Sequence, residues 1–262
     1  MYLFKAEILK LAVDYRNYLL NYVIGQITTL IFVIGLFYSF VNEQDYSSII
    51  VFIFALLFWY YSSDAISGTS DIISEELMLG TFEQLMMCKS KITGIFFCRL
   101  FVQFILRTLL AVPFFAIATT IFNAWPLLIM PLPTLLAVFG VFSITLVGLY
   151  AMGFFVASMT LVFKKIGAVS AVLSYIVLFF TGAIVNFASI PLVFRAILHI
   201  IPVTWGNKML AEIISDTNNI LQSMNFLGLV LNVLLWVLIS WISFRYFLNK
   251  AKFKGNLGSY YF

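Results

Sequence analysis

Acidic residues gather in one short stretch of an otherwise weakly charged chain. The densest cluster of carboxylates comprises three glutamates: Glu75, Glu76 and Glu83. Between them, Gly80 has the conformational freedom that commonly ends a helix. Thr81 is a favoured residue at the start of the next helix, and Gln84 is placed to complete a capping box. The pattern therefore predicts a helix, a break and a short second helix.

The short second helix combines apolar and acidic side chains. Its spacing places Phe82, Leu85 and Met86 on one side. An apolar patch with an acidic surround is suited to docking into a groove on a soluble partner. The simpler alternative is a charged loop face that contacts only water.

The other potentially reactive side chains do not form a catalytic or metal-binding pattern. Cys88 and Cys98 lack metal-ligand spacing, so we expect two free thiols. His199 has no second His or Cys beside it, as a zinc site would require. No Gly-Lys pair occurs, which excludes a P-loop in this chain. We therefore expect no catalytic, metal-binding or cofactor-binding residues.

The elements that carry these residues must lie in a membrane. Of the 262 residues, 63% are hydrophobic and 10% are charged, whereas a soluble domain usually carries about 25% charged residues. A soluble protein with so much apolar surface would precipitate. We therefore predict an all-α polytopic membrane protein that forms a single transmembrane domain over residues 1–262.

Uncharged runs of about 20 residues, long enough to cross a bilayer, predict six spans. They are Leu19–Val41, Ile49–Ser67, Ile95–Ile121, Thr134–Phe163, Gly167–Phe187 and Phe226–Phe247. Residues 68–92, after the second span, contain the acidic cluster. Residues 188–225, before the last span, are divided by Pro191 and Pro202, which predicts short helices at the membrane surface.

An amphipathic helix is predicted in residues 1–18, before the first span. Four apolar residues at helical spacing share one of its faces: Phe4, Ile8, Leu11 and Tyr15. Charged residues flank this face, which suits a helix lying in the inner membrane interface. The alternative is an ordinary helix packed on its own protein.

The basic residues predict the orientation. Six spans place both termini on one side, which then carries twelve of the Lys and Arg residues: Lys5, Lys10, Arg16, Lys89, Lys91, Arg99, Lys164, Lys165, Arg245, Lys250, Lys252 and Lys254. The opposite side carries only Arg195 and Lys208. By the positive-inside rule, both termini and residues 68–92 are cytoplasmic, and residues 188–225 are extracellular. The net charge of +4 thus reflects topology, and no nucleic-acid partner is expected.

Two charged residues fall inside predicted spans. Asp64 lies near the inner end of the second span and Arg107 lies within the third. Charges at such positions are costly and usually face the bundle interior or water. A structural Asp64–Arg107 ion pair is our first interpretation; a role in substrate binding or gating, or simple snorkelling of Arg107, are the alternatives.

Small residues in the later spans could allow helices to approach closely. They are Gly140, Gly148, Gly153 and Gly167. They could form the contact between two chains, but their positions do not locate it.

The acidic stretch resembles a known signature. The string from Glu75-Glu76 through Gly80-Thr81-Phe82-Glu83 to Leu85 is similar to the Glu-rich, Gly-Thr-Leu-Glu-x-Leu signature of the permease subunits of type-2 ABC exporters. The order of predicted elements is similar along nearly the whole chain, and Ile201–Trp205 resembles an outer segment of that family. Two features depart from the family pattern: Leu77 and Met78 follow the glutamate pair, and no Pro follows the short helix.

The resemblance implies a transport function without an ATPase site in this chain. A separate ABC ATPase, which holds ATP and Mg, would bind the short helix as a coupling helix. The implied coupling residues are Glu75, Glu76, Gly80, Thr81, Phe82, Glu83, Leu85 and Met86. A second permease chain, identical or different, would complete the path for a drug, peptide, lipid or glycan. The implied location is a bacterial plasma membrane.

The main alternative is a secondary transporter or another polytopic membrane protein that is not coupled to ATP. Secondary transporters typically show internal repeats and ionisable groups at the membrane midplane. We find no clear repeat, and only Arg107 approaches the midplane.

Overall fold

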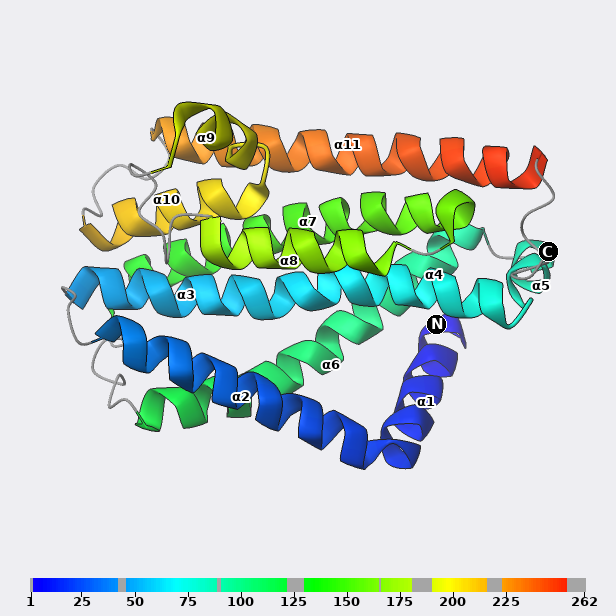
Figure 1. Cartoon of the computed structure of the whole chain (residues 1–262), viewed down its shortest axis with the longest axis horizontal. Coiled ribbons are helices and arrows are strands. Elements are labelled where there is room, and N and C mark those ends of the chain that lie inside the picture. Colours follow the sequence, from blue (N-terminus) through cyan, green and yellow to red (C-terminus); the bar gives the residue numbers. More distant parts are fainter. Residues whose placement is uncertain are drawn as a thin grey trace. The chain divides into compact units, whose positions relative to one another are not determined.

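The computed structural model describes residues 2–41, 46–88, 91–121, 130–164, 166–180, 190–215 and 223–253, and all the elements in these ranges are helices (Figure 1). In chain order they are α1 (Tyr2–Asn17), α2 (Leu19–Val41), α3 (Tyr46–Ser63), the π-helical turn η1 (Asp64–Gly68), α4 (Thr69–Met78), α5 (Phe82–Met87), α6 (Ile92–Ile121), α7 (Leu132–Phe163), α8 (Gly167–Phe180), α9 (Leu192–Leu198), α10 (Pro202–Ser215) and α11 (Met224–Phe253).

Five stretches of helix are long and apolar enough to cross a membrane. They are Leu19–Leu36, Ile49–Met78, Ile92–Ile117, Leu132–Phe163 and Met224–Phe253. Each contains most of a predicted span, so an all-helical polytopic membrane protein is the fold that the structure supports. The predicted fifth span is described only as α8, which is apolar but has 14 residues; residues 181–187 of that span lie outside the described part. The count of six spans therefore stays a prediction.

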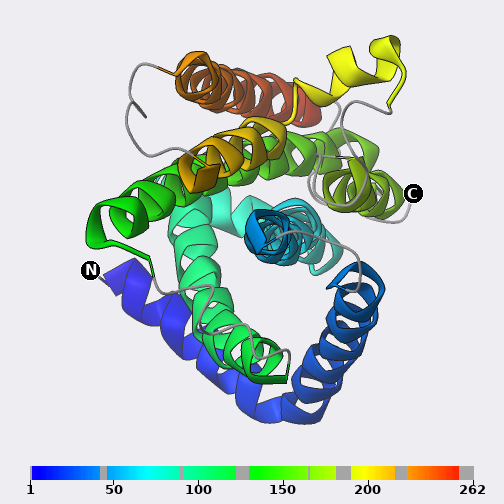
Figure 2. The same ribbon diagram turned by 90° about the vertical axis from the view of Figure 1, so that its left-hand side faces the viewer.

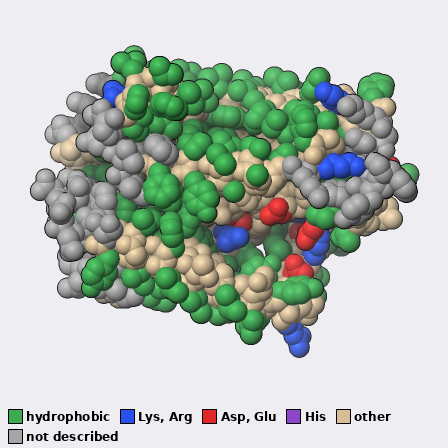
Figure 3. Space-filling model, viewed as in Figure 1, with side chains coloured by type: hydrophobic (Ala, Val, Ile, Leu, Met, Phe, Trp, Pro, Cys, Tyr) green, Lys and Arg blue, Asp and Glu red, His purple; other side chains and the backbone are tan. Residues whose placement is uncertain are grey.

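Hydrophobic side chains cover much of the visible surface (Figure 3). On α2 the exposed residues include Leu20, Ile24, Ile27 and Ile31. Water would not stabilise so many exposed aliphatic groups on one helix, whereas lipid does. The surface is thus consistent with the composition of the chain.

The helices form two compact units, which we describe separately. Unit 1 comprises residues 1–44 and 83–128, and unit 2 comprises residues 45–82 and 129–262. The boundary at Phe82 and Glu83 falls inside α5.

In unit 1, α1 and α2 both contact α6. The ring of Phe4 on α1 lies 6.1 Å from that of Phe101 on α6, and Tyr15 on α1 stacks on Tyr22 of α2 at 4.2 Å. Phe4, Leu11 and Tyr15 of the predicted apolar face are therefore turned partly toward their own protein, while Ile8 on the same face is exposed. The large apolar residues most exposed on α1 are Tyr2, Leu9 and Val13. The expectation that α1 lies in the inner membrane interface stays a prediction.

In unit 2, α7 is the central helix. It contacts α11, α10, α4 and η1, and α3 contacts α8 and α10. Seen along their axes, α3, α7, α8 and α11 run roughly side by side (Figure 2). Because α7 has neighbours on several sides, its residues Leu149 and Leu161 are fully buried.

The helix that contains the predicted second span does not stop at Ser67, where that span was predicted to end. The helix continues through η1 into α4 and ends at Met78. Beyond Gly68, the hydroxyls of Thr69 and Ser70 donate to the carbonyls of Ala65 and Ile66 at 2.6 and 2.9 Å. These bonds satisfy carbonyls at the π-helical turn, so the helix goes on.

Residues 188–225 contain two short helices where they were predicted, α9 and α10. Pro191 precedes α9 and Pro202 is the first residue of α10. Proline is tolerated there because the first N–H groups of a helix have no partner within it.

Candidate functional site

The candidate site is the turn between α4 and α5, which the sequence singled out. Gly80 ends α4 with a φ of 68°, the left-handed conformation that glycine adopts without steric cost. The N–H of Thr81 donates to the carbonyl of Glu76 at 3.1 Å, and that of Gly80 donates to the carbonyl of Leu77 at 3.3 Å. This pair of bonds is a Schellman motif. The predicted role of Gly80 as a helix stop is confirmed.

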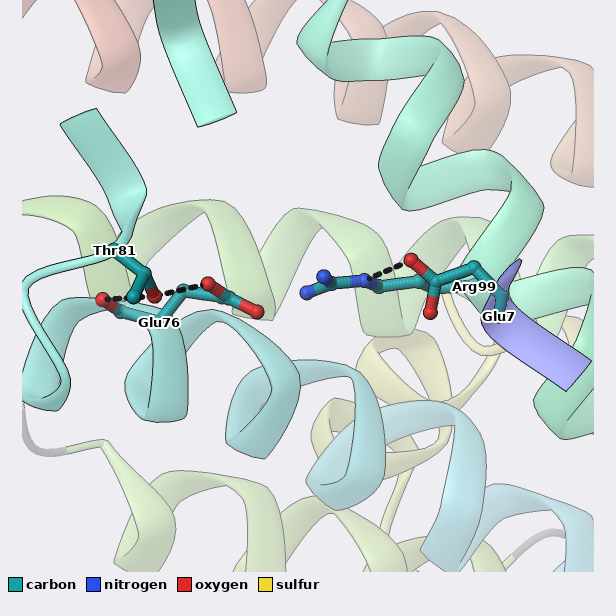
Figure 4. A network of polar contacts seen from close by, with 4 residues as sticks. All are labelled: Glu7, Glu76, Thr81 and Arg99. Carbon is teal, nitrogen blue, oxygen red and sulfur yellow. Dashed lines mark hydrogen bonds and ion pairs between the residues drawn. The ribbon is translucent and has the colours of Figure 1, made fainter. Parts of the chain in front are cut away.

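Glu76 holds this turn together. Its side chain is only 5% exposed, and its carboxylate accepts a hydrogen bond from the hydroxyl of Thr81 (Figure 4). A carboxylate this deeply buried must be hydrogen-bonded or paired to be tolerated. Glu76 and Thr81 therefore stabilise the turn, while Glu75 and Glu83 are the exposed acids of the cluster.

The apolar side of α5 differs from the prediction at one residue. The Phe82 side chain is fully buried at 0% exposure, so it cannot serve as an exposed docking contact in this conformation. Leu85 and Met86 are half-buried. The side chains that the turn does present are Met78, Leu79 and Met87, of which Met87 is 86% exposed. Helical spacing alone could not distinguish these residues from the buried ones.

We expect Gly80→Ala to weaken the turn by about 1–2 kcal/mol, because a β-carbon disfavours the left-handed conformation by that amount. No neighbouring atom would obstruct the new methyl group, so the cost comes from the backbone alone. Gly80→Asn should be milder, since Asn tolerates this conformation better. Hydrogen exchange of the α5 amides would measure the effect. Gly94→Ala is the control, because Gly94 is helical and equally open; equal protection of α5 in Gly80→Ala and Gly94→Ala would contradict the expectation.

A second feature lies at the π-helical turn η1, directly before α4 in the same continuous helix. Here the backbones of α7 and η1 are in direct contact at Gly153: a β-carbon at that position would overlap the carbonyl group of Ala65. Gly148 is also close to its neighbours, with a β-carbon there 2.8 Å from Val233. Gly140 and Gly167 have open space. Of the four glycines that the sequence suggested, two therefore make close approaches within unit 2.

Asp64 begins this π-helical turn and is 2% exposed. The hydroxyl of Tyr150 on α7 donates to its carboxylate at 3.0 Å, a partner that the sequence did not indicate. Arg107 lies on α6 in unit 1. The predicted Asp64–Arg107 pair would join the two units, and it stays a prediction.

Unit 1 contains an ion pair that sequence reasoning missed. The Nε of Arg99 on α6 donates to the Glu7 carboxylate on α1 at 2.8 Å, and both side chains are 11% exposed (Figure 4). The sequence offered one signal, an acid that flanks the apolar face of an amphipathic helix. The pair explains why the face with Glu7 turns toward α6.

The residues that could react or bind metal are dispersed. Cys88 is exposed and Cys98 is half-buried, and neither forms a disulfide. No group of three His, Cys, Asp or Glu residues within the described ranges could hold a metal ion. Comparison with protein-family models and with curated protein sequences finds no match.

Proposed function

We propose that the chain is the membrane-spanning permease subunit of an ATP-driven ABC exporter of type 2. The observation that carries the proposal is the α4–α5 turn. An apolar helix of membrane-spanning length runs without interruption to Met78, turns at Gly80 and leads into a short helix that exposes both acidic and apolar groups.

The turn has two sets of side chains with different surroundings. Glu76 and Phe82 are buried and hold the turn in shape, while Glu75, Glu83 and Met87 are exposed. A preshaped helical turn with exposed apolar and acidic groups can enter a groove on a soluble protein with little loss of entropy. In this proposal the partner is the ATPase, which holds ATP and Mg, and the present chain hydrolyses nothing.

The helix above the turn can transmit force. A displacement of α5 by the ATPase would act through α4 on η1, where one extra residue per turn weakens the regular helix hydrogen bonds. At Gly153, the α7 backbone lies directly against the π-helical turn η1. A movement of α4 would therefore be passed to α7, the central helix of unit 2. Two such chains, identical or different, would rock together to move a hydrophobic or amphipathic substrate across the plasma membrane.

The test is co-expression with a P-loop ATPase encoded beside the gene of this chain, followed by purification and reconstitution in lipid. We expect a stable complex with vanadate-sensitive ATP hydrolysis. Glu83→Lys and Met87→Asp should each reduce the amount of bound ATPase at least about tenfold, because each places an unfavourable charge at the centre of the contact.

Met224→Asp is the matched control. Met224 begins α11 and is 85% exposed, close to the 86% of Met87. It lies far from the α4–α5 turn in the sequence. This variant should bind the ATPase normally. A complex that forms equally well with Glu83→Lys and Met87→Asp, or the lack of any such ATPase gene, would refute the proposal.

Asp64 supports a second candidate, ion-coupled secondary transport. A buried carboxylate in a membrane-spanning helix, hydrogen-bonded to a tyrosine, is a typical part of ion pathways. Substrate flux in vesicles without ATP, driven by a proton gradient and lost in Asp64→Asn, would favour this candidate over the exporter.

A further inference from the structure

One face of α11 is exposed along most of the helix. Helix α11 lies along one edge of unit 2, where it packs mainly against α7 and α10 (Figure 1). Its buried residues, among them Val233 and Phe244, share one face. A second set of residues at helical spacing shares a different face and is exposed: Leu227, Leu231, Leu234, Leu238, Trp241, Arg245, Asn249 and Lys252. We call this set the exposed stripe.

The exposed stripe changes from apolar to basic toward the C-terminal end of α11. Its leucines and Trp241 are each more than half exposed. From Leu231 to Trp241 an α-helix rises about 15 Å, which equals the hydrocarbon layer of one leaflet, half of about 30 Å. Arg245 follows one turn beyond Trp241, and Lys252 follows two turns after Arg245. When the apolar part of the stripe lies in one leaflet, its basic end therefore reaches the lipid headgroups.

The side chain of Trp241 orients Arg245. The guanidinium carbon of Arg245 lies 3.8 Å from the centre of the Trp241 ring, and the ring attracts a cation placed over its face. At this distance the guanidinium makes contact through its own flat face, so the N–H donors in its plane are left to bind another group. Such a planar fork of donors matches the oxygen atoms of a phosphate.

The helices around the basic end of the stripe supply no negative charge. Neither α11 nor α7 contains an Asp or Glu residue. The acid of α10, Glu212, lies at the opposite end of α11, where Ser223 and Asn225 donate hydrogen bonds to its carboxylate. Among the described residues, neither Arg245 nor Lys252 forms an ion pair. A negatively charged group from outside the chain would therefore find two cations on one face of the helix.

We propose that Arg245 and Lys252 bind the headgroup of an anionic phospholipid whose acyl chains lie on the apolar part of the exposed stripe. Arg245 donates to the phosphate oxygens, and Lys252 adds its charge on the same face. The Trp241 ring lies at the boundary between headgroup and acyl chains, where tryptophan is enriched in membrane proteins. This site goes beyond the proposed function and does not depend on it, because it uses α11 and not the α4–α5 turn.

A second copy of this chain is a poorer occupant of the stripe. A symmetric contact between two parallel α11 helices would place Arg245 and Lys252 opposite the same residues of the other copy. Juxtaposed like charges across an interface cost several kcal/mol, and α11 has no acid that could compensate them. An anionic lipid instead offers the complementary charge.

The test measures which lipid touches Trp241. The full chain is reconstituted in bilayers of phosphatidylcholine and phosphatidylglycerol, with brominated acyl chains on one lipid or the other, because bromine quenches indole fluorescence on contact. The part of the signal that is lost in Trp241→Phe belongs to Trp241. Phosphatidylglycerol, which is anionic, should quench this part in preference to phosphatidylcholine. Equal quenching by the two lipids would refute the proposal.

Charge variants then locate the site. Arg245→Gln and Lys252→Gln should each lower the preference for phosphatidylglycerol about fivefold, the effect of one basic residue at an anionic membrane surface. Both lipids are compared in the same variant, so a change in the intrinsic fluorescence of Trp241 cancels. If Arg245→Gln does not fold, Lys252→Gln decides the matter. An unchanged preference in the variants that fold would overturn the proposal.

Lys250→Gln is the matched control. Lys250 carries the same charge at the same end of α11, but it follows Arg245 by five residues and therefore lies about 140° around the helix from it. Its ammonium is 5.6 Å from the centre of the Tyr246 ring. This variant should keep the preference for phosphatidylglycerol. If it loses as much as Arg245→Gln, the lipid responds to the overall charge of the helix end and the assignment to the exposed stripe is wrong. If Trp241→Phe leaves the total quenching unchanged, protein and not lipid covers the stripe.

Discussion

Gly153→Ala should destabilise the protein more than any other single-methyl substitution considered above. The added β-carbon would overlap the carbonyl of Ala65, which belongs to the backbone of η1 and cannot rotate away. Helix α7 would have to move away from η1, and the packing of α7 against α4 would be lost with it. We expect a loss of about 3 kcal/mol in the free energy of unfolding, at the upper end of the usual cost of overpacking.

Thermal unfolding of the purified protein in detergent measures this loss. Gly140→Ala provides the control in the same helix, because a β-carbon at Gly140 meets no atom within 4 Å. That variant should be unchanged or slightly more stable, since alanine favours a helix over glycine by about 1 kcal/mol. If the two variants melt at the same temperature, α7 and η1 are not packed as the structure describes. If the chain is the proposed exporter subunit, Gly153→Ala should also impair transport, because η1 lies between the α4–α5 turn and α7.

Arg99→Met should release α1 from α6. The substitution leaves the buried Glu7 carboxylate without its Arg99 partner, and breaking a buried pair in this way typically costs about 3–5 kcal/mol. Because α1 is a single helix at the edge of unit 1, we expect local detachment and not global unfolding. Hydrogen exchange of the α1 amides should therefore become faster, while exchange in α7 stays the same.

The double variant Glu7→Gln/Arg99→Met tests the cause. It removes both charges, so the cost of an unpaired buried carboxylate disappears, and most of the protection of α1 should return. The single variant Glu7→Gln should have an intermediate effect. If the α1 amides exchange as fast in the double variant as in Arg99→Met, the loss of protection comes from the packing of the Arg99 side chain and not from the ion pair.

Features that depend on a single segment could be predicted from the sequence. Hydropathy located the apolar helices, because the length of an apolar run is a local property. The helix stop at Gly80 was also predictable, since glycine alone adopts a φ of 68° without cost. The continuous helix beyond Ser67 was not predicted: in the folded chain the hydroxyls of Thr69 and Ser70 bond to carbonyls of the preceding turn, and the helix runs on through α4.

Features that depend on two segments required the tertiary structure. Helical spacing correctly grouped Phe82 with Leu85 and Met86, but only packing determines that Phe82 is buried while Met87 is exposed. The partner of Asp64 proved to include Tyr150, a residue with no charge to attract attention in the sequence.

The acidic stretch from Glu75 to Leu85 shows which features the local sequence determines and which the tertiary structure determines. The residue types and spacing of the stretch determined that a helix ends at Gly80 and that a short helix follows, because backbone preferences act within a few residues. The tertiary structure decided that Glu76 and Phe82 face inward while Glu75, Glu83 and Met87 face outward. Burial depends on what the rest of the chain places around a helix, and no local pattern contains that information.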